Sequence, residues 1–188
     1  MRGQAGPSLA GRRLLFVISG GIAAYKVPFA LRALAAEGAA LRVCMTPGAL
    51  QFMGAATFEA LTGAPVLTQL FGAPSAGAID HVELAQWPEQ VVVAPASASL
   101  LARMAHGLAS DAASAVLLAT RAPVLVAPAM NDGMWAHPAT AANVQALKGR
   151  GVEVIGPDEG FLAEGYAAIG RMVEPEALVD ALRAKLAR

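Results

Sequence analysis

The sequence predicts an α/β domain with a doubly wound parallel sheet, and two observations carry this prediction. Short, continuous apolar runs recur along the chain, as expected of strands buried on both faces of a sheet. Stretches with helical patterning lie between these runs, and parallel neighbours need crossover connections that usually contain helices. This alternation favours a flavodoxin-like or Rossmann-like sheet with helices on both faces.

Each apolar run ends at glycine, proline or a small polar residue, which is typical of a strand that gives way to a tight turn. The expected strands are residues 14–18, 41–45, 91–94, 124–127 and 152–155. Helices are expected at residues 22–38, 49–61, 82–86, 99–106, 112–119, 138–148 and 174–187. Residues 158–171 are rich in glycine and lack clear periodicity, so this segment is interpreted as a flap near the C-terminus.

Composition limits the size and the partners of the domain. With 188 residues, 56% of them apolar, the chain can bury one sizeable core, which we place at residues 13–188 after a flexible tail at 1–12. Lys plus Arg and Asp plus Glu are balanced at 14 each, so no nucleic-acid partner is expected. A single cysteine and no long apolar segment favour a cytoplasmic protein without a membrane partner.

Small and polar residues follow several of the expected strands. In an open parallel sheet, ligands bind beyond the carboxyl ends of the strands, where helix N-termini present free N–H groups. The turn after residues 14–18 contains two glycines, although a simple tight turn explains them equally well. Convergence of these residues on one rim suggests a flat cofactor with a phosphate. They are Ser19, Gly20, Gly21, Thr46, Ser97, Ser99 and Asn131.

Five ordered motifs resemble the homo-oligomeric flavin-containing cysteine decarboxylases. Together they cover most of the chain from residue 14 to residue 175. The motifs are SGGIAAYK at 19–26, HVELAQW at 81–87, PASAS at 95–99, PAMN with MW at 128–135 and GRM at 170–172.

The resemblance implies an FMN cofactor and a set of site residues, with no metal. It implies that His81 is a catalytic base and that Asn131 orients the carboxylate of the substrate, with Met134 and Trp135 nearby. Histidine titrates near neutrality, and a neutral amide binds a carboxylate without a charge that would hold it back. The residues expected along the cofactor are Ser19, Gly20, Gly21, Ile22, Ala23, Thr46, Phe52, Ser97, Ala98, Ser99, Ala129 and Met130.

Ordinary structural roles compete with these assignments. His81 could cap a helix or face solvent, and Asn131 is a favoured residue at the N-cap of a helix. Met130 and Trp135 could be core side chains. Cys44 lies inside an expected strand and is interpreted as a small buried apolar residue.

The resemblance is greatest to members that decarboxylate phosphopantothenoylcysteine in coenzyme A biosynthesis. Those members carry a cysteine in the flap, where this chain has Glu164 between Ala163 and Gly165. In the family, oxidation toward a thioaldehyde lets the carboxylate leave, and an enethiol results. Glu164 could supply the proton needed to finish at the saturated thiol. Otherwise the reaction stops at the enethiol, as in members that act on the C-terminal cysteine of precursor peptides.

Other classes remain as alternatives. The fold also occurs in non-catalytic flavin-binding or regulatory subunits and in a flavin prenyltransferase, although retention of His81 and Asn131 argues against a purely regulatory role. A nicotinamide-dependent Rossmann enzyme would need an acidic residue after the second strand, and residues 45–47 contain none. The resemblance further implies a homotrimer or a dodecamer, with His81 and the flavin meeting at a subunit boundary.

Overall fold

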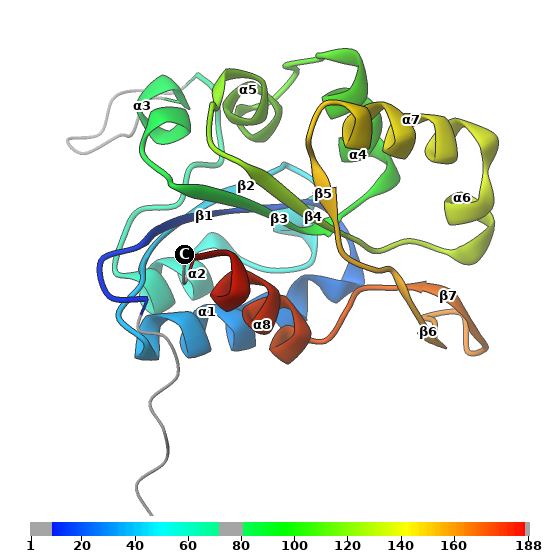
Figure 1. Ribbon diagram of the computed structural model, residues 1–188, viewed down its shortest axis with the longest axis horizontal. Helices are drawn as coiled ribbons and strands as arrows, with labels where there is room; N and C mark the ends of the chain where they lie inside the picture. The colour runs from blue at the N-terminus through cyan, green and yellow to red at the C-terminus, as the bar shows by residue number, and fades with distance from the viewer. Residues whose placement is uncertain (1–8, 72–80, 187–188) are drawn as a thin grey trace, which may run out of the picture.

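A five-stranded parallel sheet forms the centre of the computed structural model, which describes residues 9–71 and 81–186. The strand order is β2-β1-β3-β4-β5, the flavodoxin-like order of a doubly wound sheet, so the predicted fold class is confirmed (Figure 1). The strands are β1 (Arg13–Ile18), β2 (Ala40–Met45), β3 (Gln90–Ala96), β4 (Val124–Pro128) and β5 (Glu153–Val154).

Helices cover both faces of the sheet (Figure 1). One layer contains α1 (Val27–Ala36), α2 (Ala55–Thr62) and α8 (Pro175–Leu186), and the other contains α3 (His81–Gln86), α4 (Ala98–His106), α5 (Ala112–Ala119) and α7 (Pro138–Gly149). Shorter helical turns follow three strands: η1 (Ile22–Lys26), η2 (Ala49–Gln51) and α6 (Asp132–Ala136).

Alternation along the strands divides the core into two parts. In β1, Phe16 and Ile18 pack with the α1 and α8 layer, whereas Leu15 and Val17 pack with the opposite layer. All four side chains are fully buried. Because successive side chains of a strand point to opposite faces, a run that is apolar at every position suits a sheet covered on both sides.

The predicted flap is an antiparallel hairpin made of β6 (Asp158–Phe161) and β7 (Ala167–Arg171). It extends beyond the parallel sheet at the end where β4 finishes (Figure 1). The backbone N–H of Met130 donates to the carbonyl of Gly170 across 3.0 Å. A Cβ at Gly170 would lie 2.2 Å from the carbonyl oxygen of Met130, so this contact requires glycine. The flap is therefore anchored directly on the segment that follows β4.

Several details differ from the sequence-based expectations. The helix expected at residues 49–61 is η2 followed, after a break, by α2. The helix expected at residues 22–38 is η1 followed by α1, and Pro28 lies in the first turn of α1, where a missing N–H is tolerated. The five-residue helix α6 was expected only as the alternative in which Asn131 caps a helix. Leu9, placed in the expected tail, is fully buried, and Gly11 donates its N–H to Gly38; residues 1–8 lie outside the described part. No helix in the described part of the chain is long and apolar enough to cross a membrane.

Candidate functional site

A cavity of about 490 Å³ opens at the carboxyl ends of β1, β3 and β4, beneath the flap. This is the point where the strand order reverses between β1 and β3, and doubly wound sheets bind ligands in such crevices. Twelve of the residues expected at the site line it. They are Gly20, Gly21, Ile22, Ala23, Phe52, Ser97, Ala98, Ala129, Met130, Asn131, Met134 and Glu164.

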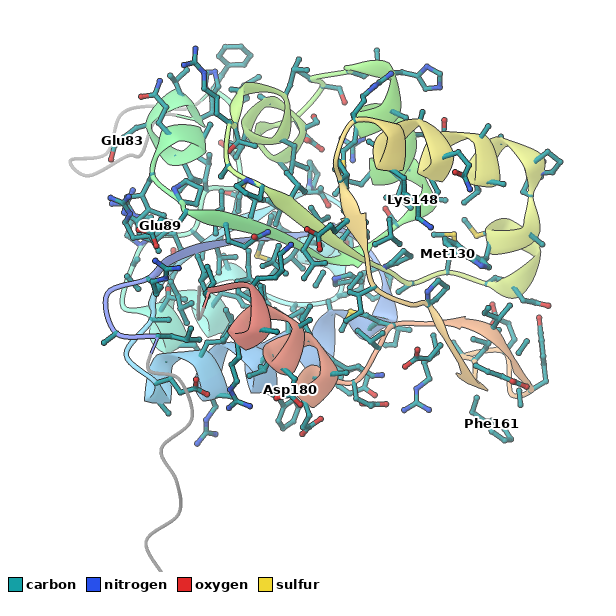
Figure 2. All side chains as sticks on the ribbon, viewed as in Figure 1. Glu83, Glu89, Met130, Lys148, Phe161 and Asp180 are labelled. Carbon is teal, nitrogen blue, oxygen red and sulfur yellow. The ribbon has the colours of Figure 1, made fainter. Side chains whose placement is uncertain are left out.

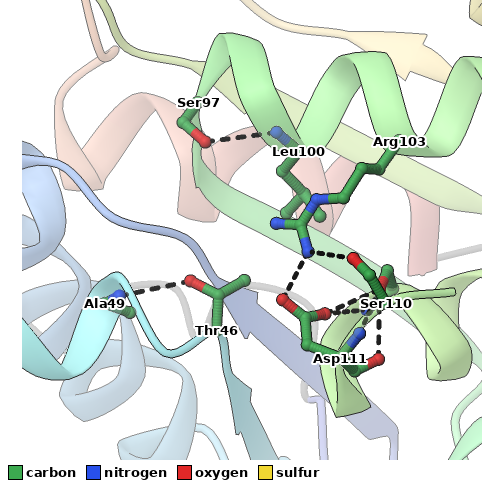
Figure 3. Close-up of polar contacts among 8 residues, drawn as sticks. Thr46, Ala49, Ser97, Leu100, Arg103, Ser110 and Asp111 are labelled. Carbon is green, nitrogen blue, oxygen red and sulfur yellow. Dashed lines mark hydrogen bonds and ion pairs between the residues drawn. The ribbon is translucent and has the colours of Figure 1, made fainter. Parts of the chain in front are cut away.

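Ser19 and Thr46 are buried and do not line the cavity. The Ser19 hydroxyl donates to the carbonyl of Pro95 across 2.7 Å and accepts from the N–H of Ser97 across 2.8 Å. Thr46 is 3% exposed, and its hydroxyl accepts from the N–H of Ala49 (Figure 3). The Ser19 hydroxyl thus joins the loop after β1 to the loop after β3, and the Thr46 hydroxyl stabilises the turn after β2. Contact of these two hydroxyls with the cofactor stays a prediction.

Two further expected residues also lie outside the cavity lining. Ser99 is exposed on the first turn of α4. Trp135 is partly buried and packs against the core cluster on the α4 and α7 side of the sheet. This packing fits the core role that was its alternative interpretation, and its contact with the substrate stays a prediction.

The two glycines after β1 have different surroundings. A Cβ at Gly20 would lie 2.9 Å from the carbonyl carbon of Gly48, so glycine is needed where the loops after β1 and β2 meet. A Cβ at Gly21 would approach nothing closer than 3.9 Å, to Pro95, because Gly21 faces the open cavity. The glycine pair thus lets two loops pack closely and leaves backbone exposed to a ligand.

Two helical segments begin at the cavity. The segment η1 starts at Ile22, and α4 starts at Ala98, with the Ser97 hydroxyl accepting from the N–H of Leu100 across 3.3 Å (Figure 3). The first N–H groups of a helix have no carbonyl partner within it, and the helix dipole places partial positive charge there. This wall of the cavity therefore favours an anionic group.

Asn131 has the N-cap role that the sequence allowed, and its amide nitrogen faces the flap. It is the N-cap of α6, where its Oδ1 accepts from the N–H of Gly133 across 2.9 Å. Its Nδ2 donates to Oε1 of Glu164 across 3.1 Å and to the hydroxyl of Tyr166 across 3.0 Å. The fold thus brings together Asn131 and Glu164, which are 33 positions apart in the sequence.

Lys26 is a cavity residue that the sequence reasoning missed as a site candidate. It is only 4% exposed, and its Nζ donates to the carbonyl of Met172 and to the carboxylate of Glu174. Burial, with repulsion from Arg171, lowers the pKa of Lys26. Arg171 also lines the cavity and pairs with Glu174. A lysine inside an otherwise apolar helical stretch was the signal that could have identified this position.

His81 is the first residue of α3, and it does not line the cavity formed by the described part of its own chain. The Thr120 hydroxyl donates to the carbonyl of Ala85 across 2.8 Å, and Arg42 lies over the ring of Trp87, so both hold α3 on the body. In Figure 2, Glu83 of α3 lies on the opposite side of the molecule from Met130 and Phe161. One chain therefore does not bring His81 to its own cavity.

Other notable groups lie away from the cavity. Arg103 binds Asp111 and Ser110, and Asp111 caps α5 by accepting from the N–H of Ser114 (Figure 3). Cys44 is fully buried in β2, as expected, and burial raises the pKa of its thiol. Among the described residues, no cluster of histidine, cysteine, aspartate and glutamate could hold a metal ion.

Known proteins share both the sequence and the architecture. The Coenzyme A biosynthesis bifunctional protein CoaBC of Escherichia coli is 44% identical over 173 residues, which are 92% of this chain and 43% of that protein. The chain thus spans less than half the length of this curated relative. The FMN-dependent cysteine decarboxylase SpaF is 32% identical with a TM-score of 0.81, and the match covers 96% of this chain and 99% of SpaF.

A variant of PPC decarboxylase complexed with pantothenoylaminoethenethiol is 29% identical, with a TM-score of 0.81 over 93% of this chain and 98% of that one. The model of the Flavoprotein family matches residues 4–187. A match of this extent indicates a flavin cofactor. From the strand order, the cavity and this match, we conclude that the chain belongs to the Flavoprotein family.

Proposed function

We propose that this chain is an FMN-dependent decarboxylase that converts phosphopantothenoylcysteine to phosphopantetheine in coenzyme A biosynthesis. The observation that carries the proposal is the cavity at the β1/β3 switch point, in which the amide of Asn131 faces the flap residue Glu164. The similarity to CoaBC, a coenzyme A biosynthesis protein, and to PPC decarboxylase supports this choice of substrate.

The residues of the cavity fit FMN. Its volume of about 490 Å³ lies within the range of cofactor sites, and apolar side chains such as Ile22, Phe52 and Met130 suit the faces of a flat ring. The exposed backbone at Gly21 and the starts of η1 and α4 suit a phosphate. When bound, the flavin supplies a two-electron acceptor for oxidation of the substrate's carbon–sulfur unit.

In this proposal, Asn131 binds and orients the carboxylate that leaves. A carboxylate becomes neutral carbon dioxide when it departs, so a cation beside it would stabilise the starting state more than the product. The Asn131 amide donates hydrogen bonds without a charge, and the N-cap bond from Gly133 holds its oxygen in place. Met134, which is half exposed in the cavity, would contact the rest of the substrate.

Glu164 is our candidate for the acid that completes the saturated thiol. Among the described residues that line the cavity, it is the single carboxylic acid. The only cysteine of the chain, Cys44, is fully buried in β2 and cannot reach the flap. A proton held on Glu164 would therefore substitute for the thiol found in this position in related decarboxylases.

We further propose that His81 acts as a base in the cavity of a neighbouring copy, within a homotrimer or a dodecamer. Its helix α3 lies on the opposite side of its own chain from the cavity, as Figure 2 illustrates. Large apolar side chains are exposed around η1 and α1, including Ile22 at 61%, Tyr25 at 54% and Phe29 at 62%. Such a patch is a natural contact surface for another copy.

A second candidate substrate is a precursor peptide that ends in cysteine. One observation favours it: the flap has a glutamate in place of the thiol that the resemblance implies. An enzyme without a suitable acid would release an enethiol and would need an external oxidant.

Anaerobic incubation tests both candidates. The flavin-loaded protein is mixed with phosphopantothenoylcysteine, or with short peptides ending in cysteine, while flavin absorbance and product mass are followed. The proposal expects the small substrate to yield the saturated thiol, with the absorbance returning to that of the oxidised flavin. Reaction of the peptides alone, or release of an enethiol with absorbance restored only by oxygen, would contradict it.

A further inference from the structure

Hydrogen bonds on two sides fix the orientation of the Asn131 amide. Because the oxygen and nitrogen of an amide are similar in shape, its direction depends on its partners. The N–H of Gly133 donates to Oδ1 across 2.9 Å, so the oxygen must face α6. Nδ2 donates to the Tyr166 hydroxyl across 3.0 Å, so this oxygen acts as an acceptor.

The Tyr166 hydroxyl accepts from Asn131 because its own proton is committed elsewhere. It donates to Oδ1 of Asp132 across 2.6 Å, and an ionised carboxylate can only accept. The same bond raises the pKa of Tyr166 and lowers the pKa of Asp132, which keeps the phenol protonated and the carboxylate ionised at neutral pH. The hydrogen bonds therefore run in one direction, from Asn131 through Tyr166 to Asp132.

The second N–H of the Asn131 amide faces a carboxylate in the cavity. Nδ2 also donates to Oε1 of Glu164, which lines the cavity on the flap. This contact marks where a carboxylate of a ligand would meet the same amide. Asn131 and Asp132 follow β4, whereas Tyr166 lies between β6 and β7, so the donor arrangement requires the flap to lie against the body.

We propose that Tyr166, held by Asp132, is a positioning residue: by accepting one N–H of Asn131, it keeps the other N–H turned toward the substrate's carboxylate. The inference rests on the proposed function, because it takes that carboxylate as the ligand of Asn131. Tyr166 acts on the substrate only through Asn131. Its effect is therefore confined to ligands that carry a carboxylate at this position.

Calorimetric titration of the flavin-loaded protein with two unreactive analogues tests this inference. The first contains serine in place of the cysteine of phosphopantothenoylcysteine and keeps the carboxylate; the second contains ethanolamine there and lacks it. We expect Tyr166→Phe to weaken binding of the serine analogue roughly threefold to tenfold, the usual effect of one lost hydrogen bond. Binding of the ethanolamine analogue should not change.

A double-mutant cycle separates positioning from general damage to the flap. Asp132 acts through Tyr166, so Asp132→Ala alone should weaken binding of the serine analogue. Added to Tyr166→Phe, it should weaken that binding little further. Glu159→Gln, an exposed change on the same hairpin, should leave both affinities unchanged.

The outcomes distinguish this inference from the proposed function. If the wild type binds neither analogue, the assigned substrate and the inference both fail. If the wild type prefers the serine analogue but Tyr166→Phe keeps that preference, only the inference fails. The inference would also be overturned if Tyr166→Phe weakened binding of both analogues equally. Additive effects of Tyr166→Phe and Asp132→Ala on binding of the serine analogue would overturn it as well.

Discussion

The side-chain amide of Asn131 donates a hydrogen bond to the carboxylate of Glu164 across 3.1 Å, which joins the end of β4 to the tip of the flap. The donor that we assign to the substrate thus already faces a carboxylate supplied by the chain itself. A substrate carboxylate must displace Glu164 from this amide or share the amide with it. The two residues are consequently suited to successive roles, Asn131 in binding and Glu164 in proton supply.

Replacement of Asn131 by aspartate should strongly reduce decarboxylation. The new charge would repel the substrate's carboxylate and remove two N–H donors, so we expect kcat/KM to fall on the order of 10- to 100-fold, as for a lost hydrogen bond to a charged group. Steady-state release of carbon dioxide measures the effect. Asn143→Asp on α7, outside the cavity, is the matched control and should retain full activity.

Glu164→Gln should change the identity of the product and have a smaller effect on the rate at which carbon dioxide is released. Glutamine keeps the size of the side chain and can still accept from Asn131, but it cannot deliver a proton. We expect carbon dioxide release to persist while the enethiol accumulates at the expense of the saturated thiol, as measured by mass spectrometry. Glu159→Gln on β6 serves as the control, and an unchanged product ratio in Glu164→Gln would exclude Glu164 as the acid.

Gly170→Ala should destabilise the protein and detach the flap. Gly170 has a φ of 151°, and an added Cβ would lie 2.2 Å from the carbonyl oxygen of Met130. We expect the free energy of unfolding to fall by about 3 kcal/mol, as for a severe backbone conflict. Gly165 has a φ of 88° but open space around it, so Gly165→Ala should lower the free energy of unfolding by only about 1–2 kcal/mol. Equal losses in urea unfolding would contradict this account.

Acid should weaken the link between α4 and α5 through Asp111. Burial opposes ionisation of this carboxyl, but hydrogen bonds from Ser114 and Arg103 outweigh it and hold the pKa of Asp111 below its ordinary value of 3.8. A depressed pKa stabilises the folded state above the ordinary value, and this contribution is lost as pH falls through the lower, folded value. Asp111→Asn should therefore be less stable than the wild type at neutral pH. The difference in urea midpoint should shrink as the solution becomes strongly acidic.

Local patterns were enough to predict the sheet and the outline of the site. The apolar run at residues 14–18 and its counterparts are typical of strands buried on both faces, and β1 to β4 lie where these runs predict. Residues that follow such strands must gather at one edge of a parallel sheet. This is why Gly21, Ser97 and Asn131 line one cavity although they are far apart in the sequence.

Side-chain partners supplied by distant segments were beyond the reach of sequence patterns. The hydroxyl of Ser19 binds the carbonyl of Pro95, 76 positions away, so it is committed to holding β1 and β3 together. Lys26 is buried because the chain after the flap folds back to place Met172 and Glu174 beside it. The five residues of α6 are too few to create a helical period, and α6 depends on the cap supplied by Asn131.

The burial of Cys44 also affects whether the protein can form mixed disulfides with small thiol compounds. It is the only cysteine in the chain, it is fully buried in β2, and burial disfavours its reactive thiolate form. The folded chain therefore presents no accessible thiol for exchange with small disulfides. The thiol substrate that we propose would therefore not be trapped on the enzyme as a mixed disulfide.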